Sequence, residues 1–300
     1  MSMGLTKQQK DDLMAVVART GGHREANINA RVIPEGYKAY QQQVVREEHT
    51  LQFPGLDPLR VIVTRPKATR PGMPLHVNYH GGGFIFRQNE DDDMYCAHLA
   101  VGIGGVVVDV DYAVCPDAVY PMAVDQSWEA AKWAFAHCKE WGCDENRFSI
   151  GGSSAGGNLS FAVALRNQTE KALKICLLVQ EYAANDLYMS IEDPAQERSA
   201  AFSRLYADGD IERLKEPMLS PVYATDEQLR QMPETIFIAP QKCPFYPINN
   251  RLGMRMVDQG VKVTFHAYPE GTHGFTIRMV GEGWLESQND AIQAIQAASL

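Results

Sequence analysis

The chain of 300 residues is long enough for one large α/β domain or two small ones, with a sizeable buried core. It is 45% hydrophobic and 22% charged, as is usual for a soluble globular protein. Its net charge of −9 argues against nucleic acids and anionic membranes as partners, because both attract clustered lysine and arginine.

The first residues lack the apolar core of a signal peptide, and no stretch approaches the length that spans a membrane. We therefore expect a cytoplasmic protein without membrane contact. The six cysteines include no C-x-x-C pair, which predicts reduced, packed thiols and no structural zinc. His137, Cys138 and Cys143 come closest to a metal-ligand cluster, but the end of a helix explains them better.

Hydrophobic periodicity predicts the elements in chain order. An amphipathic helix over residues 7–20 and an irregular helical stretch over 27–43 precede two strands, 44–53 and 59–65, which should form a hairpin. Strands then alternate with helices, which predicts an α/β fold with a mostly parallel sheet covered on both faces. The remaining predicted strands are 75–79, 106–111, 147–150, 175–180, 235–239 and 261–268, and the helices are 92–101, 122–141, 155–169, 248–259 and 284–298.

The alternation lapses between residues 181 and 232, where polar helical fragments and prolines replace it. A stretch of this kind predicts a cap inserted into the core rather than part of the sheet. The expected organisation is N-terminal cap helices at 1–43, a first part of the core at 44–184, the cap insertion at 185–232 and a second part of the core at 233–300.

A glycine-flanked serine follows the predicted strand 147–150 and precedes a predicted helix. The stretch Gly152-Ser153-Ser154-Ala155-Gly156 matches G-x-S-x-G, in which the serine sits on a tight turn with its hydroxyl at the top of a sheet. Such a turn strains the backbone and approaches neighbouring segments closely, so it needs small residues on either side. We predict Ser154 as a nucleophile.

Acyl transfer at a serine also needs a base and donors for the oxyanion. Three glycines follow the predicted strand 75–79, where bare amides can approach a substrate; the predicted donors are the N–H groups of Gly82, Gly83 and Ala155. His273 is the predicted base, because it follows the last predicted strand in a glycine-rich loop. His80 is expected to shape the oxyanion loop instead.

Together these motifs resemble the hormone-sensitive-lipase-like (HGGG) carboxylesterases of the α/β-hydrolase fold. The likeness runs from about Leu75 to the C-terminus and includes Asp111–Asp117, similar to the DYRLAPE loop of that family, and His273-Gly274-Phe275, similar to its HGF. The resemblance implies a sheet of about eight strands, a helical cap, and hydrolysis of small acyl esters without cofactor or metal. A homodimer through a sheet edge is a further expectation from the family.

Three positions depart from the family pattern. Ser153 stands where Asp is usual, and Ala113 replaces the arginine of the DYRLAPE-like loop, so a structural salt bridge is expected to be missing. At the usual place of the triad carboxylate, a gapless reading gives Lys242, whereas matching the following proline gives Cys243. The triad acid is therefore unknown. An acid could also come from another segment, for example Asp208, Asp210 or Glu270.

Two functions remain open at this point. The leading one is a serine carboxylesterase for short-chain acyl esters, and amide hydrolysis or acyl transfer to an alcohol would use the same groups. The alternative is a hydrolase-like protein that binds a small ligand with little or no turnover, because the acid position lacks Asp and Glu. In both cases we expect a small, largely apolar pocket walled by Phe84, Phe86, Tyr112 and Tyr182.

Overall fold

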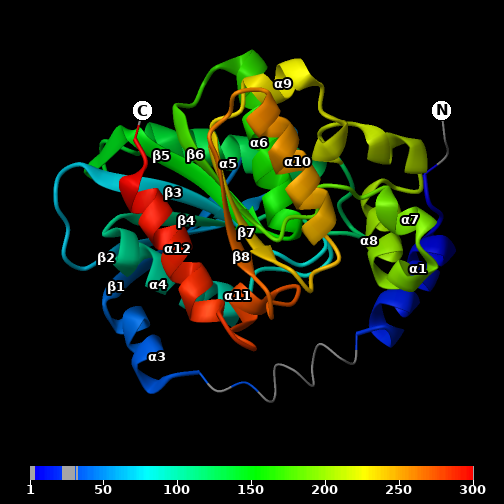
Figure 1. Cartoon of the computed structure of the whole chain (residues 1–300), viewed down its shortest axis with the longest axis horizontal. Coiled ribbons are helices and arrows are strands. Elements are labelled where there is room, and N and C mark those ends of the chain that lie inside the picture. The colour runs from blue at the N-terminus through cyan, green and yellow to red at the C-terminus, as the bar shows by residue number, and fades with distance from the viewer. Residues whose placement is uncertain (1–3, 22–30, 32, 300) are drawn as a thin grey trace.

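A computed structural model describes residues 4–21, 31 and 33–299. One eight-stranded sheet runs through it in the order β1-β2-β4-β3-β5-β6-β7-β8 (Figure 1). The strands from β4 to β8 in this order are parallel, and β2 pairs antiparallel with β1 and β4, which confirms the predicted mostly parallel sheet. The strands are β1 (Val44–Leu51), β2 (Leu59–Pro66), β3 (Met73–Tyr79), β4 (Val106–Asp111), β5 (Cys143–Ser153), β6 (Ile175–Glu181), β7 (Glu234–Pro240) and β8 (Val263–Tyr268).

Helices cover the sheet. The helices α4 and α12 contact each other, as do α5 and α6, and all four also pack against strands. The helices are α1 (Lys7–Arg19), α3 (Glu35–Gln42), α4 (Glu90–Ile103), α5 (Met122–Ala136), α6 (Ala155–Glu170), α7 (Met189–Glu192), α8 (Glu197–Tyr206), α9 (Asp226–Arg230), α10 (Tyr246–Asp258), α11 (Phe275–Arg278) and α12 (Trp284–Ala297).

The predicted elements differ from the observed ones mainly at their ends. The first part of the helical stretch 27–43 lies outside the described residues, and the rest is α3. The helix α5 ends at Ala136 instead of residue 141; residues 137–142 form turns, and Gly142 has a φ of +73° just before β5. The helix α11 was not predicted, since four residues show no periodicity.

The central strands are buried on both faces. Every residue of β3, β4 and β6 is buried, so their sequences lack the strict alternation of a half-exposed strand such as β1. Toward their carboxyl ends these strands also bury polar side chains, among them Asn78, Asp109 and Glu181. In parallel α/β sheets this end of the strands carries the ligand site.

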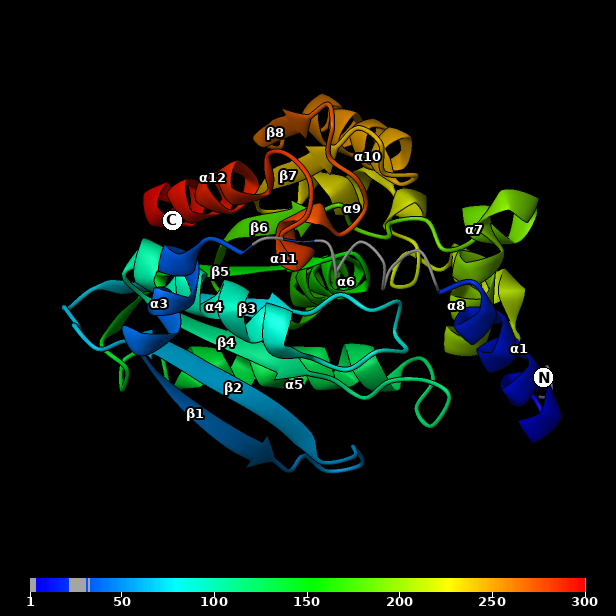
Figure 2. The same ribbon diagram turned by 90° about the horizontal axis from the view of Figure 1, so that it is seen from below.

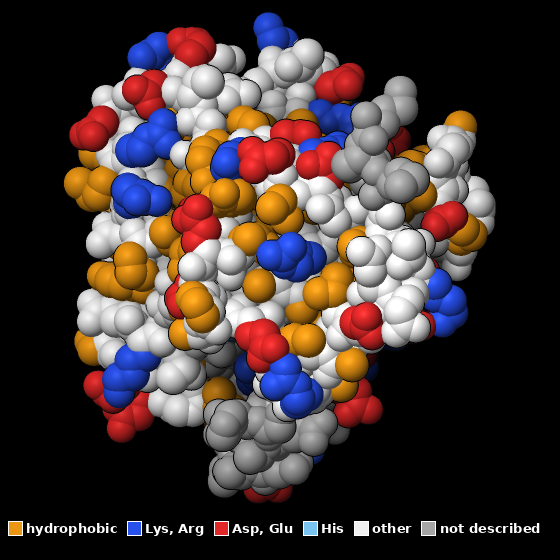
Figure 3. Space-filling model, turned by 90° about the vertical axis from the view of Figure 1, so that its right-hand side faces the viewer, with side chains coloured by type: hydrophobic (Ala, Val, Ile, Leu, Met, Phe, Trp, Pro, Cys, Tyr) orange, Lys and Arg blue, Asp and Glu red, His pale blue; other side chains and the backbone are white. Residues whose placement is uncertain are grey.

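Segments from two parts of the chain lie together beside the sheet. In the chain, the helix α1 comes before the first strand, and α8 comes between β6 and β7. In space α1 nevertheless packs along α8, with α7 next to them (Figures 1 and 2). The helix α3 packs on α4 instead. On the side where α1, α7 and α8 lie, acidic and basic side chains are interspersed with hydrophobic ones (Figure 3).

All six cysteines are free and buried, as predicted. No helix within the described ranges is long and apolar enough to cross a membrane.

A glycine in the first turn of α6 brings that helix against β3. A Cβ atom placed on Gly156 would lie 1.8 Å from the carbonyl oxygen of Tyr79. We expect Gly156→Ala to destabilise the fold by about 3 kcal/mol or more, because backbone atoms cannot move aside as a side chain can. Thermal denaturation followed by circular dichroism measures the effect.

The matched control is Gly36→Ala in α3, where an added Cβ meets nothing within 4 Å. Alanine is favoured over glycine inside a helix by about 0.5–1 kcal/mol, so this variant should melt at or above the wild-type temperature. A Gly156→Ala protein as stable as the wild type would contradict the close approach.

Glu181, at the end of β6, gives a second test of the core. Burial raises its pKa to about 7, and Tyr95 donates a hydrogen bond to its Oε1. The folded protein therefore keeps a proton that the unfolded chain releases between about pH 4.5 and 7, so this residue lowers stability as pH rises through that window. Above pH 7, the ionised Glu181 lowers the free energy of unfolding by about 3 kcal/mol.

Glu181→Gln removes this proton linkage and keeps an acceptor for Tyr95. We expect the variant to gain stability relative to the wild type between pH 5 and pH 8. Denaturation midpoints of both proteins at several pH values measure the gain. A stability difference that does not change with pH would show that Glu181 ionises normally in the fold.

Candidate active site

Ser154 lies on the sharp turn that joins β5 to α6. Its backbone has φ +54° and ψ −113°, and α6 starts at the next residue, Ala155. The amide of Ser154 donates to the carbonyl of Glu181 at 2.9 Å, and its own carbonyl accepts from Ala184 at 2.9 Å. These bonds hold a strained turn whose side chain faces the carboxyl end of the sheet.

The glycines around the turn are required by close packing. A Cβ on Gly152 would lie 2.3 Å from the carbonyl oxygen of Tyr79, the same atom that Gly156 approaches. The sequence thus places β5, the turn and α6 against the end of β3, where the glycine loop begins.

The loop between β8 and α11 brings His273 to Ser154. The Oγ of Ser154 is 3.0 Å from the Nε2 of His273, which is hydrogen-bonding distance. The ring is fixed on its sides by edge contacts with Tyr182 and Phe245, each with centroids 5.2 Å away. The two residues predicted from distant motifs therefore meet.

The other ring nitrogen of His273 faces Cys243. The distance from Sγ to Nδ1 is 3.1 Å, and Cys243 is 3% exposed in the loop between β7 and α10. Burial raises the pKa of this thiol to about 12, against the opposing effect of the backbone amides of Phe245 and Tyr246. The thiol is therefore protonated at neutral pH.

Of the two positions that the sequence left open, Cys243 is the one beside His273. Lys242 is half exposed and pairs with Glu270. Asp208 accepts from the amide of Leu5 at 3.2 Å and lies near Lys10, and Asp210 lies just ahead of the 3₁₀ turn Ile211–Lys215. The proline that follows Cys243 was the sequence signal that pointed to it.

The glycine loop after β3 has the backbone that only glycine adopts easily. Gly82 and Gly83 have φ of +138° and +64°. A Cβ on Gly82 would lie 2.6 Å from the carbonyl oxygen of Phe86, and one on Gly83 would lie 2.3 Å from the ring of Phe202 in α8. The first clash is with backbone and the second is with a side chain of α8.

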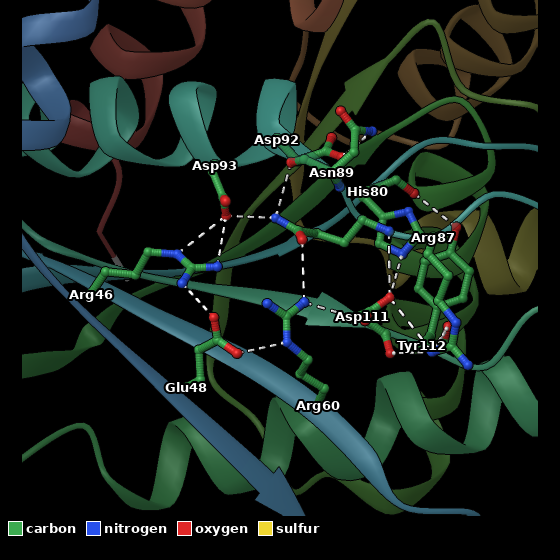
Figure 4. A network of polar contacts seen from close by, with 11 residues as sticks. Arg46, Glu48, Arg60, His80, Arg87, Asn89, Asp92, Asp93, Asp111 and Tyr112 are labelled. Atoms are coloured by element: carbon green, nitrogen blue, oxygen red, sulfur yellow. Dashed lines mark hydrogen bonds and ion pairs between the residues drawn. The ribbon is translucent and has the colours of Figure 1, made fainter.

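His80 anchors this loop without carrying charge. Its ring stacks on Tyr112, with centroids 4.2 Å apart and planes at 4°, and the Tyr112 hydroxyl donates to the His80 carbonyl at 2.8 Å (Figure 4). Burial lowers the pKa of His80 to about 4. Its Nδ1–H donates to the Gly81 carbonyl at 2.7 Å, so Nε2, which lies 3.7 Å from Asp111, is unprotonated. This close approach is thus not an ion pair at neutral pH.

Asp111, at the start of the DYRLAPE-like loop, pairs with cations from other segments. Arg60 of β2 lies 3.4 Å from Asp111, and Arg87 of the loop before α4 lies 3.6 Å from it (Figure 4). The amide of Gln88 also approaches Asp111, at 3.4 Å. Asp111 thus finds its cationic partners outside the DYRLAPE-like loop, and the loss of an ion pair through Ala113 stays a prediction.

Ser154, His273 and the glycine loop line one cavity of about 290 Å³. Of the four walls expected from the sequence, Phe84 and Tyr182 line it, whereas Phe86 and Tyr112 do not. Charged side chains that the sequence did not predict also line it: Asp91, Asp92, Asp186, Arg198 and Arg278. Apolar surface still makes up most of the lining, as expected.

Two of these acids interact with neighbouring groups. Asp91 pairs with Arg31 at 2.7 Å. Burial and the nearby carboxylate of Asp109 raise the pKa of Asp92 well above its usual value. Within the described part of the chain, no three His, Cys, Asp or Glu side chains are placed to hold a metal ion.

Comparison with known proteins finds that this chain is similar to proteins named as hydrolases. A family model described as alpha/beta hydrolase fold matches residues 76–277. The chain is 38% identical over 118 residues to carboxylesterase NlhH of Mycobacterium tuberculosis, covering 39% of this chain and 37% of that protein. It is 36% identical over 102 residues to human hormone-sensitive lipase, covering 34% of this chain and 10% of the lipase.

The alignments thus span well under half the length of these two relatives. Among solved structures, an esterase of Pyrobaculum calidifontis matches with a TM-score of 0.80 and 24% identity, covering 98% of each chain. At that identity the likeness concerns the fold. Because the family model spans more than half of the 300 residues, this chain belongs to the α/β-hydrolase-fold family, within which it resembles the hormone-sensitive-lipase-like carboxylesterases.

Proposed function

We propose that this protein is a serine carboxylesterase that hydrolyses short-chain acyl esters through an acyl-enzyme on Ser154. The observation that carries the proposal is the 3.0 Å contact between the Oγ of Ser154 and the Nε2 of His273 inside the cavity. The similarity to carboxylesterases supports the same class of reaction.

In the proposed reaction, His273 takes the hydroxyl proton as Ser154 attacks the ester carbonyl carbon. The oxyanion would accept hydrogen bonds from the amides of Gly82, Gly83 and Ala155. The imidazolium then gives its proton to the leaving alcohol, and water repeats the sequence to release the acid. The serine turn and the glycine loop adjoin the same cavity, as this geometry requires.

The size of the cavity supports short acyl groups. Its volume of about 290 Å³ lies at the lower end of the range of about 300–1,000 Å³ that is usual for small-molecule sites. We propose that α1 and residues 185–232 form a cap over this cavity, because α1 packs along α8 and Phe202 of α8 lies against Gly83. The core would then consist of residues 44–184 and 233–300.

We further propose a cytoplasmic enzyme that takes a small ester as its partner and can form a homodimer through a sheet edge. The helix α10, which packs on the edge strand β8, exposes two hydrophobic side chains, Met254 and Val257, that a second copy could cover. The alternative, a ligand-binding protein with little turnover, has less support, since the relatives named above are hydrolases.

The first test is whether hydrolysis depends on Ser154 and His273. We expect Ser154→Ala and His273→Ala to lower kcat/KM for p-nitrophenyl acetate and butyrate by about 10³-fold or more, because the nucleophile or its base is removed. A fluorophosphonate should label the wild type at Ser154, as peptide mass mapping can determine.

His137→Ala is the matched control, because His137 lies at the end of α5, outside the cavity, and its loss should leave hydrolysis unchanged. If the wild type is no faster than Ser154→Ala, the esterase proposal is wrong and the binding alternative takes its place.

The glycine loop can be tested separately. Gly82 has a φ of +138°, and Gly82→Ala would place a Cβ against the carbonyl of Phe86. The substitution should therefore displace the N–H group of residue 82, which is a predicted oxyanion donor. We expect kcat to fall by about 10²–10³-fold, the usual cost of one lost oxyanion donor, with a smaller change in KM. Steady-state kinetics with p-nitrophenyl butyrate measure both.

Gly72→Ala is a control for backbone strain, because Gly72 also has positive φ (+74°) but lies at the other end of β3. It should leave kcat unchanged. An equal loss of kcat in both variants would mean that strain alone, rather than the oxyanion donor, explains the effect.

A further inference from the structure

The Nδ1 side of His273 faces a cysteine at the place where related hydrolases carry a carboxylate. The thiol is buried, with its sulfur 3.1 Å from Nδ1. The backbone holds it there: the amide of Cys243 donates to the carbonyl of Pro240 at 3.1 Å, and Tyr246 donates to the carbonyl of Cys243 at 3.0 Å. The sulfur is therefore fixed between the end of β7 and the start of α10.

We infer that the thiol of Cys243 is the third member of the triad and positions His273 by accepting a hydrogen bond from its Nδ1–H. This inference rests on the proposed function, because it concerns the base of that reaction. Cys243 would touch neither substrate nor reacting atoms, so its role is to position another residue.

The proton positions follow from the two contacts of the ring. Ser154 can give its proton to Nε2 only if Nε2 is bare, which places the ring proton on Nδ1, facing the sulfur. When the serine proton moves to Nε2, the ring becomes an imidazolium and the Nδ1 proton stays in place. No proton leaves Cys243, whose sulfur acts only as an acceptor.

A thiol differs from a carboxylate in two respects. Sulfur is a weak acceptor, so it holds the Nδ1–H tautomer less firmly. A neutral thiol also gives no charge to stabilise the imidazolium, whereas the carboxylate of a serine hydrolase does. The wild type should therefore be an active but weakened esterase.

Two features near Cys243 favour a negative charge, although burial opposes it. The amides of Phe245 and Tyr246 face the sulfur, and α10, which begins at Tyr246, favours negative charge at its N-terminus. An aspartate oxygen extends further from Cβ than sulfur does, so it would come within the range of a charge-assisted hydrogen bond to Nδ1. Position 243 thus suits an acid that the sequence does not supply.

The experiment compares wild type, Cys243→Ala, Cys243→Ser and Cys243→Asp with p-nitrophenyl butyrate across pH 5–9. We expect Cys243→Ala to lower kcat by about tenfold with little change in KM, and Cys243→Ser to keep most of the activity. Cys243→Asp should raise kcat/KM by at least about tenfold, a fraction of the roughly 10⁴-fold effect of a triad carboxylate. Cys138→Ala is the control at another buried cysteine and should leave all values unchanged.

The pH profile separates positioning from packing. A carboxylate next to Nδ1 raises the pKa of His273, so the acidic limb of kcat/KM should move to higher pH in Cys243→Asp. The other titratable and charged groups near the ring are common to all variants. Tyr182 lies at the ring edge, Arg278 lies beside Gly274, and Lys242 and Glu270 lie in the adjoining loops. Asp92 and Asp186 line the cavity, and Glu181 lies behind its wall.

The inference is overturned if Cys243→Ala keeps both kcat and the pH profile of the wild type. It is also overturned if a folded Cys243→Asp protein shows neither the gain nor the shift. Should Cys243→Asp fail to fold, as its melting curve would show, Cys243→Ala and Cys243→Ser still decide.

A measurement without substrate keeps the two proposals apart. ¹⁵N NMR of labelled histidine, assigned with His273→Ala, reports which ring nitrogen carries the proton. We expect the Nδ1–H form in the wild type and a mixture in Cys243→Ala. Absence of Ser154-dependent hydrolysis would refute the proposed function, whereas an unchanged tautomer in Cys243→Ala would refute the role of Cys243.

Discussion

The close approach of α6 to the end of β3 is the constraint on which the rest of the site depends. Two glycines, Gly152 and Gly156, reach the carbonyl of Tyr79 at distances that any side chain would prevent. Because the glycine loop starts one residue after Tyr79, the same contact sets the loop beside Ser154. The turn and the loop are thus one packed unit, held by backbone rather than by side chains.

Around this unit, the charged groups serve mainly to hold segments in place. Asp111 joins β2, the loop before α4 and the end of β4 through Arg60, Arg87 and Gln88 (Figure 4). His80 is kept neutral by burial and works through stacking and hydrogen bonds. The histidine that is proposed to move protons, His273, lies on a different loop, with aromatic edges around it.

Much of this could be predicted from the sequence, because strand periodicity and short glycine motifs are local signals. The sheet, the meeting of Ser154 with His273 and the place of Gly82 and Gly83 all followed from motifs at strand ends. The partner of Nδ1 did not, because a one-residue difference in loop packing separates Lys242 from Cys243. Charged cavity walls such as Arg198 come from segments whose placement depends on tertiary packing, which periodicity does not report.

The contact between α8 and the glycine loop has an evolutionary consequence. The ring of Phe202 lies against Gly83, and Tyr206, one turn further along α8, stacks on Phe84 with centroids 3.8 Å apart. A substitution in α8 that reshapes the cavity wall for a new substrate would therefore also change the packing of the loop proposed to stabilise the transition state. Selectivity and rate share one packed interface here, so adaptation of one would require compensating changes in the other.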